Sequence, residues 1–255
     1  MILTIDIGNT NILLGCFKGN ELVFRERISS KREATDLEYA AMIKTALDMY
    51  TLTPQQIDGA IMASVVPTIT NTLKRAIEKL IGIETLVVGP GIKSGLSIHI
   101  DNPAQLGSDL VVDAVAGIHH YPLPQIIIDM GTATTFSVID QHGFYVGGMI
   151  TAGMAISAEA LVRSTSQLSK VDFEKPKKLI GTNTVDCVKS GLLHATACSI
   201  DGMAERIEVE LGQPCTVIIT GGLAGVIKPL CKRGMILDED LILKGLLHIY
   251  HKNCR

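Results

Sequence analysis

Residues Ile2 to Thr10 decide the fold: they read ILTIDIGNT, a short apolar run that ends in an acid, Asp6, and a turn at Gly8. A second apolar run continues to Phe17, and after a Lys-Gly-Asn turn a third run ends at Ile28. Short apolar runs divided by turn residues are typical of strands joined in hairpins. The stretch therefore predicts a strand, a turn, and two further strands.

The same pattern returns past the middle of the chain. Residues 125–135 read QIIIDMGTATT, and in them Asp129 and Gly131 stand where Asp6 and Gly8 stand in the first copy. Two more apolar runs follow, divided by a turn that contains a glycine. A pattern that repeats after about half the chain indicates a duplicated domain.

Each expected hairpin is followed by alternating helical and strand-like segments. The helices expected are at about 36–50, 70–81, 153–163, 185–211 and 240–250. The additional strands expected are at 57–66, 85–88 and 216–220. We therefore predict an α/β protein of two domains, residues 1–120 and 121–255, each a mixed sheet with flanking helices.

The composition excludes several classes of protein. The chain has 255 residues, 23 Lys plus Arg against 26 Asp plus Glu, and a net charge of -3, which does not fit a strongly basic nucleic-acid binder. Its 47% apolar residues are typical of a compact enzyme rather than a disordered chain. The uncharged stretch 143–158 is too short and too rich in glycine to span a bilayer.

The N-terminus and the cysteines bear on localisation. The first residues lack the basic region of a signal peptide and meet Asp6 at once. The six cysteines form no C-x-x-C pair and no zinc spacing, so we expect reduced thiols. Together these features predict a cytoplasmic protein with neither a nucleic-acid nor a membrane partner.

The two Asp-x-Gly turns offer a site for phosphates. The chain has no Walker A motif, no G-x-G-x-x-G after a strand, and no protein-kinase set. In the turns, glycine lets the backbone approach a phosphate, Thr or Asn side chains can donate hydrogen bonds, and the acid at the strand end can hold a cation. One such turn serves in most cases only to reverse the chain. Two copies in a duplicated fold favour hairpins that grip a polyphosphate for phosphoryl transfer.

A third group, Gly107-Ser108-Asp109, lies where a helix is expected to start. Asp109 has two interpretations: a cap stabilised by the helix dipole, or a general base that takes the proton of an alcohol attacking the terminal phosphate. Asp113, one turn further, could raise the pKa of Asp109 or simply be solvated.

Two other segments attract attention. His119 and His120 lie at the expected end of this helix. Imidazoles at a helix end hydrogen-bond to the free carbonyl groups there more often than they bind a metal. The loop 89–95, GPGIKSG, places Lys93 among glycines without the Walker spacing, and we expect a mobile connector there.

Further motifs follow in order along the chain. They are SVVP at 64–67, DNP at 101–103, GSD at 107–109, DMGTATT at 129–135, GG at 147–148, GTNT at 181–184, SGL at 190–192 and TGGLA at 220–224. With these motifs, almost end to end, the chain resembles the type III pantothenate kinases. That family belongs to the superfamily of sugar kinases, actin and heat-shock chaperones. The resemblance therefore implies duplicated ribonuclease-H-like (actin-like ATPase) domains, each with a mixed five-stranded sheet.

The resemblance also implies an activity and its residues. The activity is ATP-dependent phosphorylation of pantothenate to 4'-phosphopantothenate, the first step of coenzyme A biosynthesis. Asp109 would be the catalytic proton acceptor, Gly107, Ser108 and Thr184 would line the pantothenate site, and Thr132 would add a second contact to ATP. The residues implied for the ATP phosphates are Asp6, Ile7, Gly8, Asn9, Thr10, Asn11, Ile12 and Leu13.

Cations and a second subunit complete what the resemblance implies. Asp129 would bind a monovalent cation, potassium or ammonium, and magnesium would accompany ATP. The family is homodimeric with the active site at the subunit interface, so Thr184 would come from the neighbouring subunit. The predicted helix 185–211 would then lie near that interface.

At two positions that the resemblance assigns to the substrate pocket, the chain departs from the family's pattern: Leu110 stands in place of an Arg and Ile100 in place of a Tyr. A lost guanidinium removes a charge-assisted hydrogen bond worth roughly 1.5 to 3 kcal/mol. The alternatives are therefore an ATP-binding paralogue with an altered pocket that acts as a regulator, or a kinase of another small hydroxy compound. The retained acids Asp6, Asp109 and Asp129 favour the pantothenate kinase.

Overall fold

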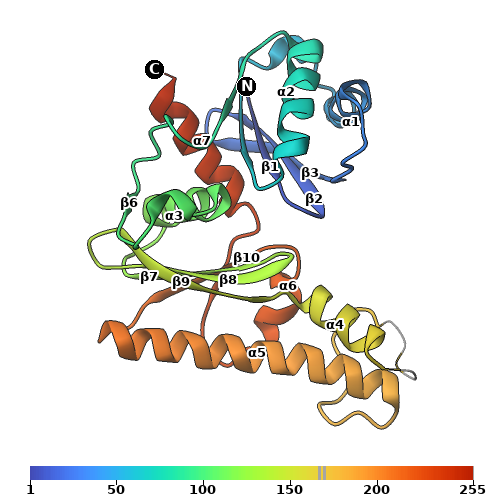
Figure 1. The fold of residues 1–255 in the computed structure, drawn as a ribbon, viewed down its shortest axis with the longest axis vertical. Helices are drawn as coiled ribbons and strands as arrows, with labels where there is room; N and C mark the ends of the chain where they lie inside the picture. Colours follow the sequence, from blue (N-terminus) through green and yellow to red (C-terminus); the bar gives the residue numbers. More distant parts are fainter. Residues whose placement is uncertain (166–167, 169–170, 255) are drawn as a thin grey trace. The chain divides into compact units, whose positions relative to one another are not determined.

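The computed structural model describes residues 1–165, 168 and 171–254 (Figure 1). The chain forms two compact units. The first comprises Met1–Leu96, Asn102–His119 and Asp240–Arg255, and the second comprises Ser97–Asp101 and His120–Glu239. The expected domain boundary near residue 120 thus differs from this division in the C-terminal segment, which packs in the first unit, and in the short piece before Asn102, which packs in the second.

The first unit contains a five-stranded mixed sheet, in the order β3-β2-β1-β4-β5. Its strands are β1 (Ile2–Ile7), β2 (Asn11–Lys18), β3 (Glu21–Ser29), β4 (Gly59–Ser64) and β5 (Thr85–Val87). The strands β1, β2 and β3 pair antiparallel, as the hairpin pattern predicts, while β4 and β5 run parallel to β1.

Helices cover both faces of this sheet (Figure 1). They are α1 (Asp36–Met49), α2 (Pro67–Ile81), α3 (Ser108–His120) and α7 (Leu241–Asn253), with short 3-10 turns at Pro54–Gln56 and Pro103–Gln105. Alternate residues of β4 separate the two layers: Ala60 and Met62 join the core under α1 and α2, whereas Ile61 and Ala63 join the core under α3 and α7. Successive side chains of a strand point to opposite faces, so one strand contributes to both cores.

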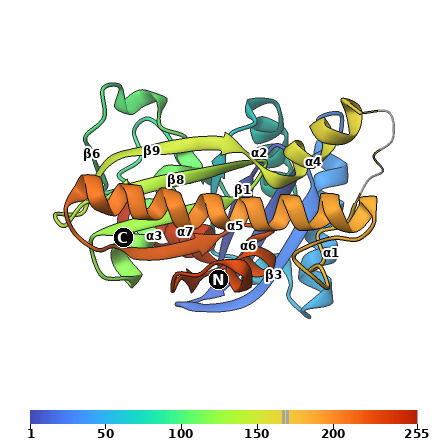
Figure 2. The same cartoon turned by 90° about the horizontal axis from the view of Figure 1, so that it is seen from below.

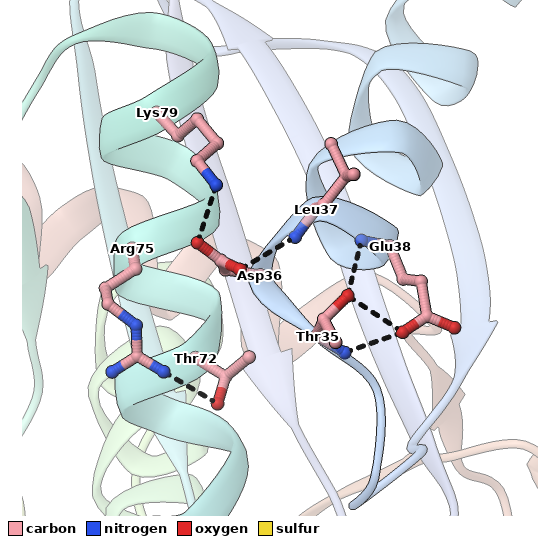
Figure 3. Close-up of polar contacts among 7 residues, drawn as sticks. All are labelled: Thr35, Asp36, Leu37, Glu38, Thr72, Arg75 and Lys79. Atoms are coloured by element: carbon pink, nitrogen blue, oxygen red, sulfur yellow. Dashed lines mark hydrogen bonds and ion pairs between the residues drawn. The ribbon is translucent and has the colours of Figure 1, made fainter.

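The start of α1 shows how local sequence sets an element (Figure 3). The Glu38 N–H donates to Thr35 Oγ1 (3.3 Å), and the Thr35 N–H donates to Glu38 Oε2 (2.7 Å), which is a capping box. Lys79 Nζ on α2 donates to Asp36 Oδ2 (2.8 Å), so the two helices are joined at this end. Helix α2 begins at Pro67, earlier than expected near residue 70, because proline suits the first helical position.

The second unit repeats the topology and adds a strand. Its sheet has the order β11-β10-β7-β8-β9-β6. The strands are β6 (Ser97–Ile98), β7 (Gln125–Met130), β8 (Ala133–Ile139), β9 (Phe144–Ala152), β10 (Thr216–Thr220) and β11 (Ile236–Leu237). Strands β7 to β11 pair as β1 to β5 do, so the duplication is confirmed. The expectation of five strands is wrong for this unit, because β6 pairs parallel with β9 over only two residues and leaves no apolar run in the sequence.

Helix α5 (Thr184–Leu211) lies along one face of the second sheet, beside α4 (Met154–Arg163) (Figure 2). Its buried stripe, Leu193, Ala197, Ile200 and Ala204, packs with strand residues such as Ile128. The short α6 (Ala224–Ile227) and the 3-10 turn Lys228–Leu230 follow β10. All six cysteines are free thiols. Over the described residues, none of the helices combines the length and apolar character needed to cross a membrane.

Candidate active site

The first expected phosphate turn follows β1. The Gly8 N–H donates to the Asn11 carbonyl (3.0 Å), and a Cβ on Gly8 would lie 3.1 Å from that oxygen, so the turn is tight. Ser30 holds it from the neighbouring strand end: its hydroxyl donates to the Gly8 carbonyl (2.6 Å) and its N–H to the Thr10 carbonyl (3.0 Å). Asn9, Thr10 and Asn11 are exposed. The turn is thus fixed by its flanks and open at its tip.

The apolar residues assigned to this turn have side chains turned to other uses. Ile7 and Ile12 are fully buried in the core under α1 and α2, and Leu13 is half-buried against the opposite core. Only their backbone groups could contact a ligand. Asp6 is half-buried and pairs in register with Leu13 on one side and Ala63 on the other, so it lies between two strands at the end of β1.

A pair of hydrogen bonds brings Asp109 to the same sheet edge. The Ser64 N–H donates to Ser108 Oγ (3.2 Å), and the Ser108 hydroxyl donates to the Ser64 carbonyl (3.1 Å). Ser64 ends β4 and pairs in register with Ile7, and the Val65 N–H donates to the Ile7 carbonyl (3.1 Å). The start of α3 is therefore anchored beside the strand end that leads into the first turn. Ser108, expected to line the substrate site, uses its hydroxyl to make this anchor.

The surroundings of Asp109 change its acidity. Burial raises the pKa of its carboxyl above the usual range, and the N–H groups of Leu110 and of Asp109 itself offset part of that shift. The Leu110 N–H donates to Asp109 Oδ1 (2.9 Å), which is the contact expected of an acid in the first turn of a helix. A Cβ on Gly107 would collide with the same oxygen, so this carboxylate position requires a glycine there. Asp113 is 2% exposed, and the interpretation that it is solvated is wrong.

The second expected turn lies in the second unit, after β7. Asp129 is half-buried and pairs in register with Thr135 and with Thr220, the last residue of β10. The Gly131 N–H donates to the Ala133 carbonyl (3.0 Å), as the Gly8 N–H does to Asn11 in the first copy. In both copies the glycine N–H thus donates to a carbonyl across the turn, but the acceptor is three residues on in the first turn and two residues on in the second, which is one residue shorter.

Two glycines let other segments approach this second turn. Gly221 has a φ of +93°, and a Cβ there would lie 2.5 Å from Asp129 Oδ1. The Gly153 N–H donates to the Thr132 carbonyl (3.1 Å), and a Cβ on Gly153 would lie 2.6 Å from the Gly131 carbonyl. Any larger residue at either position would displace the turn.

The donors around Asp129 limit the kind of ion that fits. Across the described residues, no group of three or more His, Cys, Asp or Glu side chains could hold a metal ion. A cation at Asp129 would therefore take its other ligands from backbone carbonyls or water. Such an oxygen set with one carboxylate suits a weakly held, hard cation.

Thr184 is the first residue of α5 and is exposed. The preceding Asn183 caps the helix, its side chain accepting from the Asp186 N–H (2.9 Å). Alongside α5 runs an apolar groove of about 530 Å³, bounded by α4 and by β8 and β9, with Phe136 and Leu192 in its lining. Apolar side chains are exposed on β9, on α4 and around the start of α5, namely Ile150, Ile156, Leu161, Leu179, Ile180 and Val185.

Comparison with known proteins decides the family. Residues 2–206 match the family described as type III pantothenate kinase. The chain belongs to this family. A type III pantothenate kinase from Halalkalibacterium halodurans is 40% identical over 253 residues, covering 99% of this chain and 100% of that protein. A second, from Exiguobacterium, is 41% identical over 253 residues and covers 99% of each chain.

The fold is that of the actin-like ATPases and sugar kinases. A solved ROK hexokinase from Thermus thermophilus superimposes with a TM-score of 0.52 at 12% identity, covering 99% of each chain. The predicted family and the predicted fold are thereby confirmed.

Some positioning residues carry no obvious chemistry in the sequence. Ser64 and Gly221 belong to motifs that support the resemblance, SVVP and TGGLA, yet neither motif indicates a role for them. Gly153 belongs to none of the quoted motifs. What could have drawn attention to Ser64 and Gly221 is their place directly after a strand core, where parallel strands of an α/β sheet end beside a ligand site.

Proposed function

We propose that the protein transfers the terminal phosphoryl group of ATP to the primary hydroxyl of pantothenate, giving 4'-phosphopantothenate and ADP. This is the first step of coenzyme A biosynthesis. The observation that carries the proposal is the placement of Asp109, with a raised pKa, beside the edge of the sheet where the first Asp-x-Gly turn begins. A base and a phosphate turn at one edge are the parts that transfer to an alcohol requires.

The first turn would bind phosphates. Backbone N–H groups at its tip and the exposed side chains of Asn9 and Thr10 are donors that suit phosphate oxygens, and Thr132 of the second turn offers a further hydroxyl. Magnesium bound to ATP would neutralise part of the phosphate charge.

Asp109 would act as the base. It would accept the proton of the substrate hydroxyl while that oxygen forms its bond to the terminal phosphorus and the bond to ADP breaks. A carboxylate with a raised pKa is a stronger base, which favours the proton transfer. Gly107 and the Ser108 anchor would serve by holding the carboxylate in place.

The remaining assignments belong to the same proposal. Asp129 would hold a monovalent cation, potassium or ammonium, together with backbone oxygens. The protein would act as a homodimer in the cytoplasm, with Thr184 of one chain lining the pantothenate site of the other. The apolar groove along α5 and the exposed apolar side chains around it support a second copy as its occupant, because such a surface is costly to leave in water.

A second candidate rests on Leu110, which is half-buried next to Asp109. An apolar side chain in place of the family's Arg cannot pair with a carboxylate, so the substrate could be another small hydroxy compound, or the protein could bind ATP without turnover.

An ADP-release assay with pantothenate, run beside calorimetric titration of ATP, tests the proposal. Turnover with pantothenate supports it, and Leu110→Arg should then raise the rate by lowering the KM for pantothenate. ATP binding without turnover on pantothenate would overturn it. Turnover restricted to another alcohol would favour the altered kinase.

A further inference from the structure

A hollow lined by basic side chains lies in the first unit, at the far end of α3 from Asp109. It measures about 270 Å³ and is formed by the loop 89–95, α3 and α7; its lining is Ser94, Val115, His119, His248, His251 and Lys252. Asp109 and His119 stand at opposite ends of α3, roughly 15 Å apart at about 1.5 Å per residue. The hollow is therefore separate from the kinase base.

The loop wall of the hollow is fixed to α7. Asn253 Oδ1 accepts from the Lys93 N–H (3.1 Å), and Asn253 Nδ2 donates to the Lys93 carbonyl (3.1 Å) and to the Ile249 carbonyl (2.8 Å). Gly95 has a φ of +82°, and a Cβ there would collide with Lys252 Nζ, so the ammonium packs directly against the loop backbone. The expectation of a mobile connector does not fit this loop, because side chains of α7 contact it at both Lys93 and Gly95.

The opposite wall presents two stacked imidazoles. The rings of His119 and His248 lie 4.3 Å apart between centroids, at 22° to each other. His119 Nδ1 lies 2.8 Å from the Val115 carbonyl. A carbonyl only accepts, so Nδ1 carries the hydrogen and Nε2 is the atom left for another partner.

The ionisable side chains that line the hollow are all basic. Helix α3 contributes His119, α7 contributes His248, His251 and Lys252, and the loop contributes the Ser94 hydroxyl. Among the described residues, no carboxylate lines the hollow, and no group of three or more His, Cys, Asp or Glu side chains could hold a metal ion.

The geometry points to a binding site for a phosphate-sized oxyanion, either free phosphate or the phosphate of a small phosphomonoester. Imidazole rings, an ammonium and a hydroxyl line a volume below that of most drug-sized pockets, which suits one tetrahedral anion rather than a whole nucleotide. The Lys252 ammonium, already placed against the loop, would make the charge-assisted contact.

The test uses the full chain with ADP present, so that the nucleotide site is filled. Inorganic phosphate is titrated in slightly acidic solution, where histidine side chains generally take up protons, and the imidazole signals are followed by NMR. We expect saturable shifts of His119, His248 and His251. Lys252→Gln should weaken binding about tenfold or more, because it removes a charge-assisted contact. Glycerol phosphate titrated in parallel distinguishes a phosphomonoester, which would bind more tightly, from free phosphate.

A matched control keeps the test sharp. Lys93→Gln removes the same charge from the adjoining loop but does not line the hollow, so it should bind phosphate as the parent chain does. His251→Gln, at an exposed position, provides a second variant that should weaken binding and leave kinase turnover unchanged. Three results would overturn the inference: no saturable imidazole shift, a shift that appears only when ADP is left out, or equal weakening by Lys93→Gln and Lys252→Gln.

Discussion

Gly221→Ala should destabilise the second unit more than any ordinary glycine substitution. The residue has a φ of +93°, and its added Cβ would lie 2.5 Å from Asp129 Oδ1 and 2.6 Å from the Met130 nitrogen. A left-handed backbone costs a non-glycine residue about 1 to 2 kcal/mol. Forcing an extra carbon into a packed site adds about 1 to 3 kcal/mol. The free energy of unfolding should therefore fall by roughly 2 to 5 kcal/mol.

Gly212→Ala is the matched control. Gly212 caps α5 with a φ of +71°, but nothing lies within 4 Å of its added Cβ. Only the backbone cost remains, about 1 to 2 kcal/mol. The difference between the two variants therefore isolates the steric contact with Asp129 and Met130.

Urea unfolding followed by far-UV circular dichroism measures both variants, since the chain has no tryptophan to report by fluorescence. Turnover is measured in parallel, and Gly221→Ala should lose activity at urea concentrations where it is still folded, because its Cβ displaces the Asp129 carboxylate. Equal losses of stability in the two variants would refute the reasoning about the contact. Full activity in a folded Gly221→Ala protein would refute the role of the Asp129 position.

The further predictions concern the first unit. Asp109→Asn should abolish ADP release while ATP binding persists. Burial raises the pKa of Asp109 in the folded state, so its ionised form opposes folding above that pKa. The melting temperature of the variant near neutral pH should therefore be no lower than that of the parent. For the same reason the acid limb of kcat/KM against pH should lie above the value of about 3.9 typical of aspartate. Ser108→Ala should lower kcat with little effect on ATP affinity, measured by ADP release and calorimetry, since it removes the anchor that places Asp109. Thr35→Ala should lower the free energy of unfolding by about 1 kcal/mol in urea, because it removes the α1 cap. The hydrogen bond from Lys79 lowers the pKa of Asp36, so ionised Asp36 stabilises the folded state above its unfolded-state pKa, and this stabilisation is lost as the pH falls through its folded-state pKa. In Asp36→Asn the melting temperature should therefore fall less on acidification than in the parent.

The sequence predicts the elements that have their own local pattern. Strand β10 has the expected bounds, and helices α1, α4 and α5 differ from the expected ranges by a residue or so, because each has a clear apolar period and a defined end. Strand β6 was missed because two residues carry no periodicity.

Assignment of α7 to a unit illustrates a different limit. The spacing of Leu243, Leu246 and Ile249 predicts an amphipathic helix, and the structure has that helix with these residues buried. The period shows that a face is buried but not which sheet covers it. The close approach that decides the matter is at Gly245, where a Cβ would collide with the Val112 carbonyl of α3. Contacts between segments so far apart in sequence leave no local signal.

The same limit explains why the sequence predicts only part of the candidate site. Reactive groups such as Asp109 stand out by their chemistry, whereas the residues that place them do not. Strand register makes Ala63 the counterpart of Thr220, since they pair with Asp6 and Asp129 respectively, so the next residues, Ser64 and Gly221, occupy equivalent positions.

At these equivalent positions the two copies have diverged. In the first, Ser64 exchanges hydrogen bonds with Ser108 and so fixes the helix that carries Asp109, the proposed base. In the second, Gly221 has no side chain, and the absence of a Cβ is what lets the Asp129 carboxylate lie against the backbone. The equivalent position of the two sheets thus anchors a helix in the first unit and leaves room for a carboxylate in the second. The two turns are similar, and this single position accounts for a difference in how their surroundings are held.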